Sequence, residues 1–523
     1  MKHPRHYHYP SSNVGLHRRE ARPANGLVLR LLLNALLYGG LFVGIWAAYL
    51  SGIFTIGPAF VSMSLVLVVY NLVEMYRVKQ RGKDEWYISP ALWCGLFTFI
   101  LGYGLANPLY LLLPDDMLFG MGIVPGITDA MLWTVGYAFV GAVGLYFGYW
   151  AISSVRITRW FWVRSLKRRI LKGPNAALTL NMVVVMFVLS VAARLMMVKV
   201  GQYGYSMDHS TFHESVGYIA YLSILGGAGR IALLLYAMER FRISPATRAK
   251  SAVLYGMLMI EVLLGVLAGF KSQVIMPFII VGIGYFIARR RVPITFIVLG
   301  ILAFPVAFAI VEPFREVRNT DAGFVSNDIG YLIGAVIEGQ RRSPEEDAAS
   351  TWGVFVLKSN LLYPSSLGVE YAKSDVRERL RPYEPEFLSH LLLSPVLAVV
   401  PRFVWPSKPM TPQVGGWARA FILGRDDGGG AFGIGPIAYL VLAGGGIAVF
   451  VAFLVIGFLQ RIVFSITTPW MSMPGLVVFI FVAQNFLMID SNVSGVIGNV
   501  FRGFALGLLA QYFLFRDSKV RKF

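Results

Sequence analysis

Long apolar segments alternate with short polar ones along most of the chain, and this alternation predicts the fold. Runs of about 20 apolar residues are long enough to cross a bilayer as helices. Such runs occur near residues 29–50, 54–75, 88–112, 129–152, 177–198, 216–238, 251–269, 273–289, 293–312, 433–458, 472–490 and 494–515. The pattern therefore predicts an all-α polytopic membrane protein with about twelve transmembrane helices.

One long polar stretch, from Glu312 to Phe432, interrupts the apolar pattern. Apolar residues at three- and four-residue spacing predict short helices within it, at Asp328–Glu338, Trp352–Tyr371 and Pro385–Val400. The last of these is too short to span a bilayer, which indicates a re-entrant or interfacial helix. The predicted organisation is a basic tail (1–28), transmembrane helices 1–9 (29–312), a large loop with re-entrant or interfacial helices (313–432), transmembrane helices 10–12 (433–515) and a second tail (516–523).

Composition agrees with a membrane protein, because 56% of the 523 residues are hydrophobic and only 14% are charged. A net charge of +19 would suit nucleic acid, but many of the cations stand in short loops between apolar segments, so we expect no nucleic-acid partner. The single cysteine, Cys94, excludes a disulfide framework. The N-terminal histidines His3, His6 and His8 are interpreted as part of a solvated tail, with metal binding as the alternative.

The distribution of cations over the short loops predicts the orientation. Basic residues fill alternate loops, at 77–83, 156–172, 240–250 and 289–291, whereas the loops 114–128 and 201–215 carry no Lys or Arg. Loops rich in Lys and Arg face the cytoplasm. Both termini are therefore expected to be cytoplasmic, and the segment 313–432 is expected to face outward.

Three cations stand where a membrane segment should have none: Arg194, Arg230 and Lys271. A cation at membrane depth costs at least about 2.5–3.5 kcal/mol, so it normally faces a polar cavity or a partner. That partner is either an anion of the substrate or, for the two arginines, Glu261 or Glu214, and the further alternative for both arginines is snorkelling toward the membrane surface. For Lys271 the alternative is a simple interfacial anchor.

The outward segment has mixed charges, and for the clusters 341–347 and 373–386 we favour a solvated surface. Its most distinctive run is Pro401-Arg402-Phe403-Val404-Trp405-Pro406-Ser407-Lys408-Pro409, followed later by Gly433-Ile434-Gly435-Pro436-Ile437-Ala438-Tyr439 at the start of an apolar segment. These runs, together with the topology, resemble bacterial polysaccharide polymerases of the O-antigen (Wzy) type.

The resemblance implies a GT-C-like glycosyltransferase of the bacterial inner membrane with a periplasmic active site. Such an enzyme transfers a growing glycan from undecaprenyl pyrophosphate to a lipid-linked repeat unit of an O-antigen, capsule or exopolysaccharide. Its expected partners are undecaprenyl-pyrophosphate-linked oligosaccharides, membrane lipids, a chain-length regulator and a flippase. The alternatives are an O-antigen ligase-type glycosyltransferase and a transporter of lipid-linked oligosaccharides or anions.

This chemistry requires cations for the pyrophosphate, a general base and a surface for the sugar. The predicted pyrophosphate-binding residues are Arg315, Arg318, Arg402, Lys408, Lys271, Arg230 and Arg194. The predicted catalytic residues are Glu370, His390 and Arg402, with Glu338 and Asp328 as further candidates for the base; the predicted sugar- or lipid-binding residues are Trp405, Trp417 and Tyr439, with core packing as the alternative for the tryptophans. No metal or other cofactor is expected.

Overall fold

The chain divides into two compact units, which are described separately. Unit 1 comprises Met1–Ala176 and Gly353–Phe523, and unit 2 comprises Ala177–Trp352. The structure is a computed structural model and describes residues 25–82, 86–105, 128–151, 157, 171, 176–201, 203–204, 212–242, 248–289, 291, 293–320, 334, 337–338, 361–400, 405, 407, 414–422, 433–469, 472–483, 486, 489 and 493–516.

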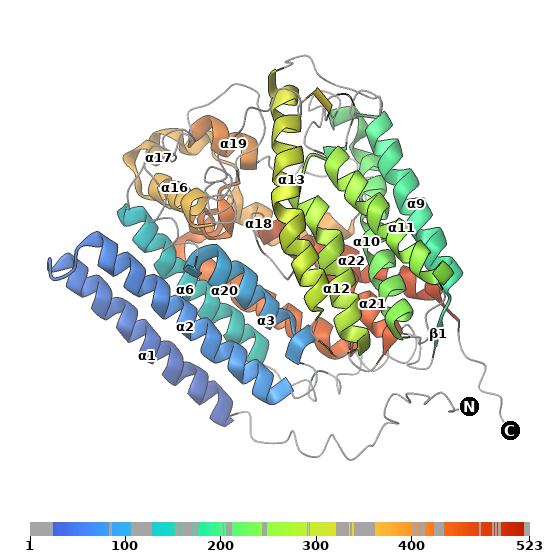
Figure 1. Cartoon of the computed structure of the whole chain (residues 1–523). Coiled ribbons are helices and arrows are strands. Elements are labelled where there is room, and N and C mark those ends of the chain that lie inside the picture. Colours follow the sequence, from blue (N-terminus) through green and yellow to red (C-terminus); the bar gives the residue numbers. More distant parts are fainter. Residues whose placement is uncertain are drawn as a thin grey trace. The chain divides into compact units, whose positions relative to one another are not determined.

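The first part of unit 1 is helical. Its elements are α1 (Asn25–Leu50), α2 (Ile56–Gly82), the 3-10 turn η2 (Trp86–Ile88), α3 (Pro90–Cys94), the π-helix η3 (Gly95–Leu105) and α6 (Asp129–Trp150). Pro90 opens α3, where its missing N–H is not needed for helix hydrogen bonding. Helices α1, α2 and α6 run side by side and pack against one another (Figure 1).

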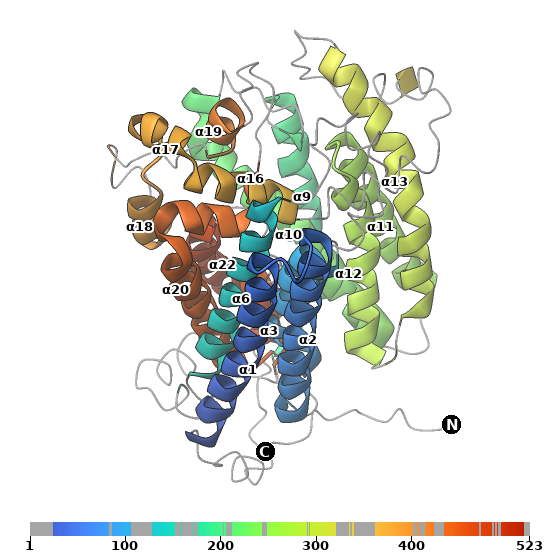
Figure 2. The same cartoon turned by 90° about the vertical axis from the view of Figure 1, so that its left-hand side faces the viewer.

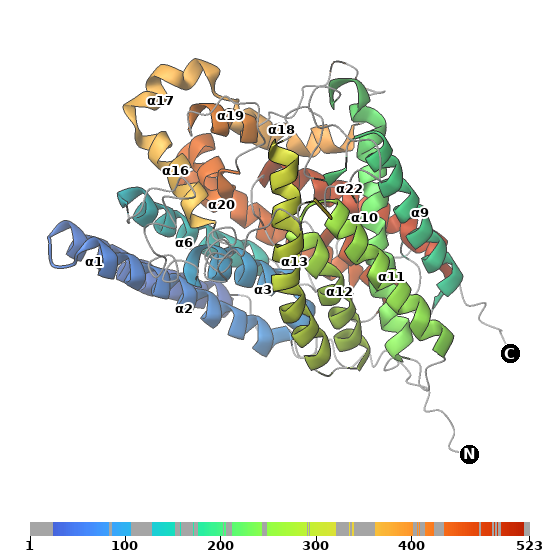
Figure 3. The same ribbon diagram turned by 45° about the horizontal axis from the view of Figure 1, so that its top comes forward.

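The second part of unit 1 contains short helices followed by long apolar ones. Its elements are α16 (Leu362–Lys373), α17 (Asp375–Leu380), η5 (Arg381–Tyr383), α18 (Phe387–Val399), α19 (Val414–Phe421), α20 (Gly435–Thr467), α21 (Met473–Ala483), α22 (Val493–Leu514) and the two-residue strand β2 (Phe515–Arg516). Figure 3 shows α16, α17 and α19 lying together near α20. The helix predicted over 385–400 is confirmed as α18.

The core of unit 1 forms where α20 packs along α6. Glycines allow this close approach, because a Cβ added at Gly144 of α6 would lie 2.5 Å from the carbonyl oxygen of Phe450. Gly148 of α6 and Gly457 of α20 likewise face backbone atoms of the opposite helix. Small residues at such contacts let apolar helices gain van der Waals packing, which is the main source of helix association in a membrane.

Helix α20 is broken near its first third. Gly444 and Gly445 have non-helical backbone angles, and Gly445, at φ 66° and ψ −155°, adopts a conformation that favours glycine. The preceding half-helix is buried throughout, and Arg377 of α17 donates from Nη2 to the carbonyl of Leu442 at 3.1 Å. Arg377 also pairs with Glu384, with 3.0 Å between Nε and Oε1. Arg377 and Glu384 therefore make specific contacts, whereas the other charged residues of the cluster 373–386, such as Asp375, Glu378 and Arg379, are exposed, as predicted for a solvated surface.

Unit 2 is a separate group of helices. It contains the two-residue strand β1 (Ala177–Leu178), α9 (Leu180–Lys199), α10 (Phe212–Arg242), α11 (Arg248–Leu267), α12 (Lys271–Arg289) and α13 (Ile294–Thr320). Helix α10 packs against α9, α11 and α12, and α12 also packs against α11 and α13 (Figure 2). Apolar side chains such as Leu263 of α11 and Ile279 of α12 are exposed, as expected for faces in contact with lipid.

Eight helices among the described residues are long and apolar enough to cross a membrane. The predicted segments near 88–112 and 472–490 contain shorter apolar helices in the described part of the chain, Pro90–Leu105 and Met473–Ala483. The segments near 216–238 and 293–312 lie within α10 and α13, and α13 continues to Thr320, past its predicted end. The prediction of a helical membrane protein is confirmed at this level, while the division at residues 312 and 432 stays a prediction.

Candidate functional site

A charged cluster lies inside unit 2, formed by Arg194 of α9, Arg230 of α10 and Glu261 of α11. Arg194 and Glu261 are almost completely buried, with exposed fractions of 5% and 2%. Arg194 Nη1 lies 2.8 Å from Glu261 Oε2, and Arg194 Nε and Nη2 donate to the carbonyl oxygen of Gly226 at 2.8 and 2.5 Å. Of the two carboxylates predicted as alternatives to a substrate anion, Glu261 pairs with Arg194, while the side chain of Glu214 lies outside the described residues.

The glycines of the Gly226-Gly227-Ala228-Gly229 run make room for this cluster. A Cβ at Gly226 would lie 3.1 Å from Arg194 Cγ, and a Cβ at Gly229 would lie 2.7 Å from Glu261 Oε1. Ser190 secures the same place, because its hydroxyl donates to the carbonyl of Gly226 at 2.6 Å and accepts from the amide of Gly229 at 2.9 Å. These small residues therefore leave space for a guanidinium and a carboxylate between closely packed helices.

Among the described side chains the charges of the cluster are unequal, since two guanidinium groups accompany one carboxylate. Arg230 is part-buried, and its buried Nε has no hydrogen-bond acceptor among the described residues. Oxygen Oε1 of Glu261 is also buried and has no donor in that part of the chain. A buried charge without a full set of partners is costly. The cluster therefore retains capacity to bind an anion or water.

The cluster lies toward one end of unit 2. Arg194 is little more than one turn before the end of α9 at Lys199, and Glu261 is less than two turns before the end of α11 at Leu267, which places both within about 10 Å of those ends. Lys271 begins α12 after the short turn that follows α11, and its exposed fraction is 8%. Three of the predicted cations, Arg194, Arg230 and Lys271, thus belong to the same unit.

The structure buries two residues that were predicted to contact sugar or lipid. Trp417 has an exposed fraction of 9% and Tyr439 of 1%. The ring of Phe387 lies 5.4 Å from that of Trp417 and 5.3 Å from that of Tyr439, and Tyr371 packs on Trp417 at 5.4 Å. In this arrangement both rings pack within unit 1, which was the alternative stated for Trp417, and neither offers an open face to a ligand.

The candidates for the general base fall in different environments. Glu370 is exposed on α16, whereas its neighbours Val369 and Tyr371 occupy the buried face of this helix. His390 lies on α18, but its side chain is outside the described residues. Among the described residues, no hydrogen bond or ion pair joins Glu370 to an acidic or basic partner.

Other predicted residues are placed only partly. Arg315 and Arg318 lie on α13, but their side chains are outside the described residues, as are Arg402 and Lys408 entirely. Trp405 is half-buried, and its Nε1 donates to the hydroxyl of Ser407 at 3.2 Å. The predicted convergence of these cations stays a prediction. Among the described residues, no group of three or more His, Cys, Asp or Glu side chains could hold a metal ion.

A second polar cluster, in unit 1, was not predicted from the sequence. Lys373 of α16 places its Nζ 3.1 Å from the ring centroid of Trp133 on α6, and Tyr49 of α1 donates to Asp129 at 2.6 Å. Partial desolvation lowers the pKa of Lys373 to about 8, and Asp129 opposes that shift. Burial and Glu384 raise the pKa of Tyr371 on the same helix to about 12. These residues are distant in sequence, so no local spacing could reveal them.

The fold and the buried charges define a helical membrane protein that holds ionised groups within one of its helical units. More specifically, the chain belongs to a family described as a domain of unknown function (DUF8712), whose model matches residues 175–471. The matched region includes all of unit 2 and continues through α16 to α20. No curated protein and no solved structure matches the chain.

Proposed function

We propose that the protein is a membrane glycosyltransferase that transfers a growing glycan from undecaprenyl pyrophosphate to a lipid-linked repeat unit, at the periplasmic face of the bacterial inner membrane. The observation that carries the proposal is the unequal charge of the buried cluster, where Arg194 and Arg230 share one carboxylate, Glu261. A guanidinium can bind two oxygens of a phosphate at once. A diphosphate carried by a lipid reaches such a site from within the membrane.

The proposed reaction requires a leaving group stabilised by cations. The bond between the glycan C1 and the diphosphate oxygen breaks, and its electron pair passes to the diphosphate. The acceptor hydroxyl forms the new bond to C1 and gives its proton to a base, for which Glu370 and His390 are the candidates. Preplaced donors such as Arg230 stabilise the developing charge, an effect worth about 2.7–4 kcal/mol for one donor in other enzymes.

We include the finer architecture in the same proposal. It comprises about twelve transmembrane helices in a GT-C-like arrangement, cytoplasmic termini and an outward-facing segment from 313 to 432. Lys271, Arg315, Arg318, Arg402 and Lys408 would extend the cationic surface toward the periplasm. Support comes from the position of the buried cluster, which lies near the same helix ends as Lys271.

Two other functions remain candidates. A ligase of the O-antigen type would use the same bond chemistry with lipid A core as the acceptor. A transporter of lipid-linked oligosaccharide is favoured by the break at Gly444 and Gly445 of α20, because discontinuous helices are common at substrate sites of transporters. The three functions differ in the product that each one forms.

The test supplies purified protein in vesicles with undecaprenyl-diphosphate repeat units. Longer lipid-linked chains would support a polymerase, a product that forms only after adding lipid A core would indicate a ligase, and movement of label across the bilayer without bond formation would indicate a transporter. Absence of elongation with a substrate proven competent for another polymerase would refute the proposal.

The role of the cluster is tested by Arg230→Gln and Arg230→Lys. We expect Arg230→Gln to lower elongation by about 100-fold or more, since one preplaced donor is lost. Arg230→Lys should restore part of the activity, because lysine keeps the charge without the planar fork. Arg289→Gln is the matched control, because Arg289 is exposed at the far end of α12 in the same unit. Equal activity of Arg230→Gln and the control would remove Arg230 from the site.

A further inference from the structure

Basic side chains gather at one end of unit 1, where three of its long apolar helices begin or end. Arg30 lies in the second turn of α1, Arg81 lies in the last turn of α2, and Trp150 ends α6. Arg461 of α20 reaches the same place, because its guanidinium carbon lies 5.5 Å from the centroid of the Trp150 ring. We call Arg30, Arg81 and Arg461 the basic patch. Tryptophan at the end of a membrane helix is typical of the headgroup layer, so the patch lies at the depth of lipid phosphates.

Two like charges act on Arg81 from other helices. The guanidinium carbons of Arg81 and Arg461 lie 5.3 and 5.5 Å from the centroid of one ring, that of Trp150. Arg30 of α1 repels Arg81 as well. Among the described residues, no carboxylate lies within 4.0 Å of any of the three arginines. In this part of the chain the patch therefore carries a positive charge that no ion pair offsets.

The carboxylate nearest to the patch in the described structure is engaged by a fourth arginine. Glu74 of α2 is completely buried, and its Oε1 accepts from Arg77 Nη1 at 2.6 Å and from Asn34 Nδ2 at 3.3 Å. Glu74 attracts Arg81 only from a longer distance. Because Glu74 and Arg77 neutralise each other, they leave the charge of the patch largely uncompensated.

Aromatic rings hold Arg461 without neutralising it. Its guanidinium carbon lies 5.1 Å from the centroid of the Tyr149 ring, and its Nη1 donates to the Tyr149 hydroxyl over a long distance of 3.5 Å. Its Nε is buried and has no acceptor among the described residues. Contacts with aromatic faces orient a guanidinium and keep its charge. Arg461 is half-buried, whereas Arg30 and Arg81 are exposed beside it, so an anion can reach the patch from the surface.

We propose that the basic patch binds the phosphate of an anionic phospholipid. A guanidinium binds two phosphate oxygens at once, and basic clusters between membrane helices suit anionic headgroups. The acyl chains lie along exposed apolar side chains of α1 next to Arg30, which include Leu29, Leu33 and Leu36. A zwitterionic headgroup brings an ammonium to a surface that is already positive, so the patch favours a lipid with a net negative charge. This site is independent of glycan transfer.

The first test measures lipid binding to the purified full-length protein by native mass spectrometry, with phosphatidylglycerol and phosphatidylethanolamine added in turn. We expect phosphatidylglycerol to bind more tightly. Arg81→Gln and Arg461→Gln should each weaken its binding by about tenfold, the effect of losing one hydrogen bond to a charged group, and should narrow the difference between the two lipids. Equal binding of the two lipids to the wild-type protein, or unchanged binding of phosphatidylglycerol to both variants, would overturn the proposal.

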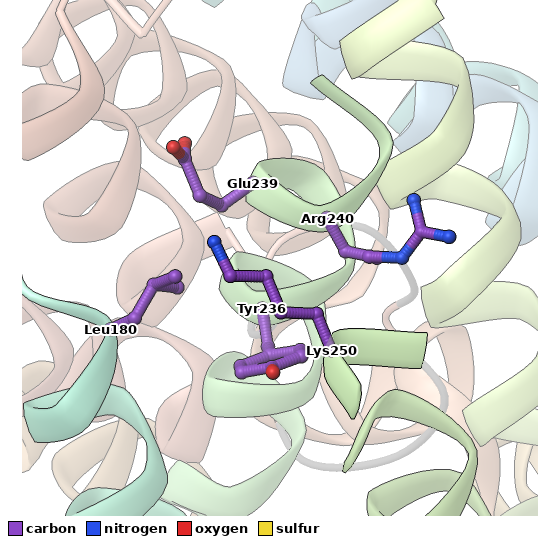
Figure 4. Close-up of a pocket in the computed structure, with 5 residues that line it drawn as sticks. All are labelled: Leu180, Tyr236, Glu239, Arg240 and Lys250. Atoms are coloured by element: carbon purple, nitrogen blue, oxygen red, sulfur yellow. The ribbon is translucent and has the colours of Figure 1, made fainter. Parts of the chain in front are cut away.

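Arg240→Gln is the matched control. Like Arg461, Arg240 is half-buried near the end of a long helix, but it lies in unit 2 and donates from Nε and Nη2 to the hydroxyl of Ser251 at 3.0 and 2.7 Å. Figure 4 shows Arg240 in the wall of a pocket that is too small for a water molecule and is otherwise lined by Leu180, Tyr236, Glu239 and Lys250. We expect Arg240→Gln to leave lipid binding unchanged. A tenfold loss in this variant would show that any lost cation weakens binding, which would contradict a site at the patch.

A second measurement uses only the wild-type protein, in case a variant does not fold. Inorganic phosphate and polyglutamate, each at the concentration of the lipid, should displace little phosphatidylglycerol, because neither gains from the apolar surface of α1. Complete displacement by phosphate would assign the patch to a free anion. Complete displacement by polyglutamate would assign it to an acidic protein segment. Either result would overturn the proposal.

Discussion

Replacing either member of the Arg194–Glu261 pair tests whether the buried charges of unit 2 act together. The three variants are Arg194→Met, Glu261→Met and the double replacement, which exchanges the pair for apolar side chains. In the native protein Arg194 Nη1 lies 2.8 Å from Glu261 Oε2, and both side chains are buried. Either single change leaves a buried charged group without its main partner.

The expected loss of stability can be worked out from the distance between Arg194 Nη1 and Glu261 Oε2. At 2.8 Å and an effective dielectric constant of about 20, the Coulomb attraction is about 6 kcal/mol. Desolvation of the two ions offsets most of this, so the intact pair is nearly neutral relative to an apolar pair. Removing one partner leaves the desolvation cost without the attraction, and we expect a loss of about 3–5 kcal/mol in the free energy of unfolding.

The position of Arg230 near Glu261 lets us predict which of the two single variants loses more stability. After Arg194→Met, Glu261 still has the guanidinium of Arg230 nearby, as their electrostatic interaction indicates. After Glu261→Met, two guanidinium groups remain in the cluster without a carboxylate. We therefore expect Glu261→Met to be the more destabilising single change, and the double variant to lose less than the sum of the two single losses.

The assay is reversible unfolding in mixed micelles at increasing dodecyl sulfate, followed by tryptophan fluorescence. Ser223→Ala is a suitable control, since Ser223 is exposed on α10 and should change the free energy of unfolding by less than about 0.5 kcal/mol. Additive losses in the double variant, or single losses below about 1 kcal/mol, would contradict a coupled buried pair. A larger loss for Arg194→Met would contradict the contribution of Arg230.

Three further changes test other parts of the fold. Gly148→Ala places a methyl group against the backbone of α20 and should cost about 1–3 kcal/mol in detergent unfolding, whereas Gly136→Ala on the same helix meets open space and should stabilise by up to about 1 kcal/mol. The pKa of Lys373 is lowered from 10.5 to about 8, so the unfolded chain binds more protons than the folded one between these two pH values, and the free energy of unfolding rises with pH there. Lys373→Met should flatten this rise in stability, measured as unfolding midpoints from pH 7 to 11. An unchanged dependence of the midpoint on pH would contradict the role of Lys373. Arg377→Met removes the donor to the Leu442 carbonyl and should speed amide hydrogen exchange on both sides of the α20 break, with unchanged exchange as the contrary result.

The apolar pattern determined which segments are helices, because a bilayer accepts only backbone that satisfies its own hydrogen bonds. It also marked Arg194 and Arg230 as exceptional, since a cation within an apolar run is costly wherever the helix packs. The glycine runs before Arg230 and at the α20 break were visible as well. The structural role of these glycines could not be predicted, because a glycine can occur at a turn, at a close contact between helices or at a bend.

Only the tertiary structure decided which groups meet. It paired Arg194 with Glu261, and it placed Trp417 and Tyr439 in packed positions. It also gathered Tyr236, Glu239 and Lys250 around one pocket. Sequence periodicity reports which face of a helix is apolar, but the neighbour of that face depends on how the helices pack. Contacts between residues far apart in the chain therefore cannot be read from the local pattern of either segment.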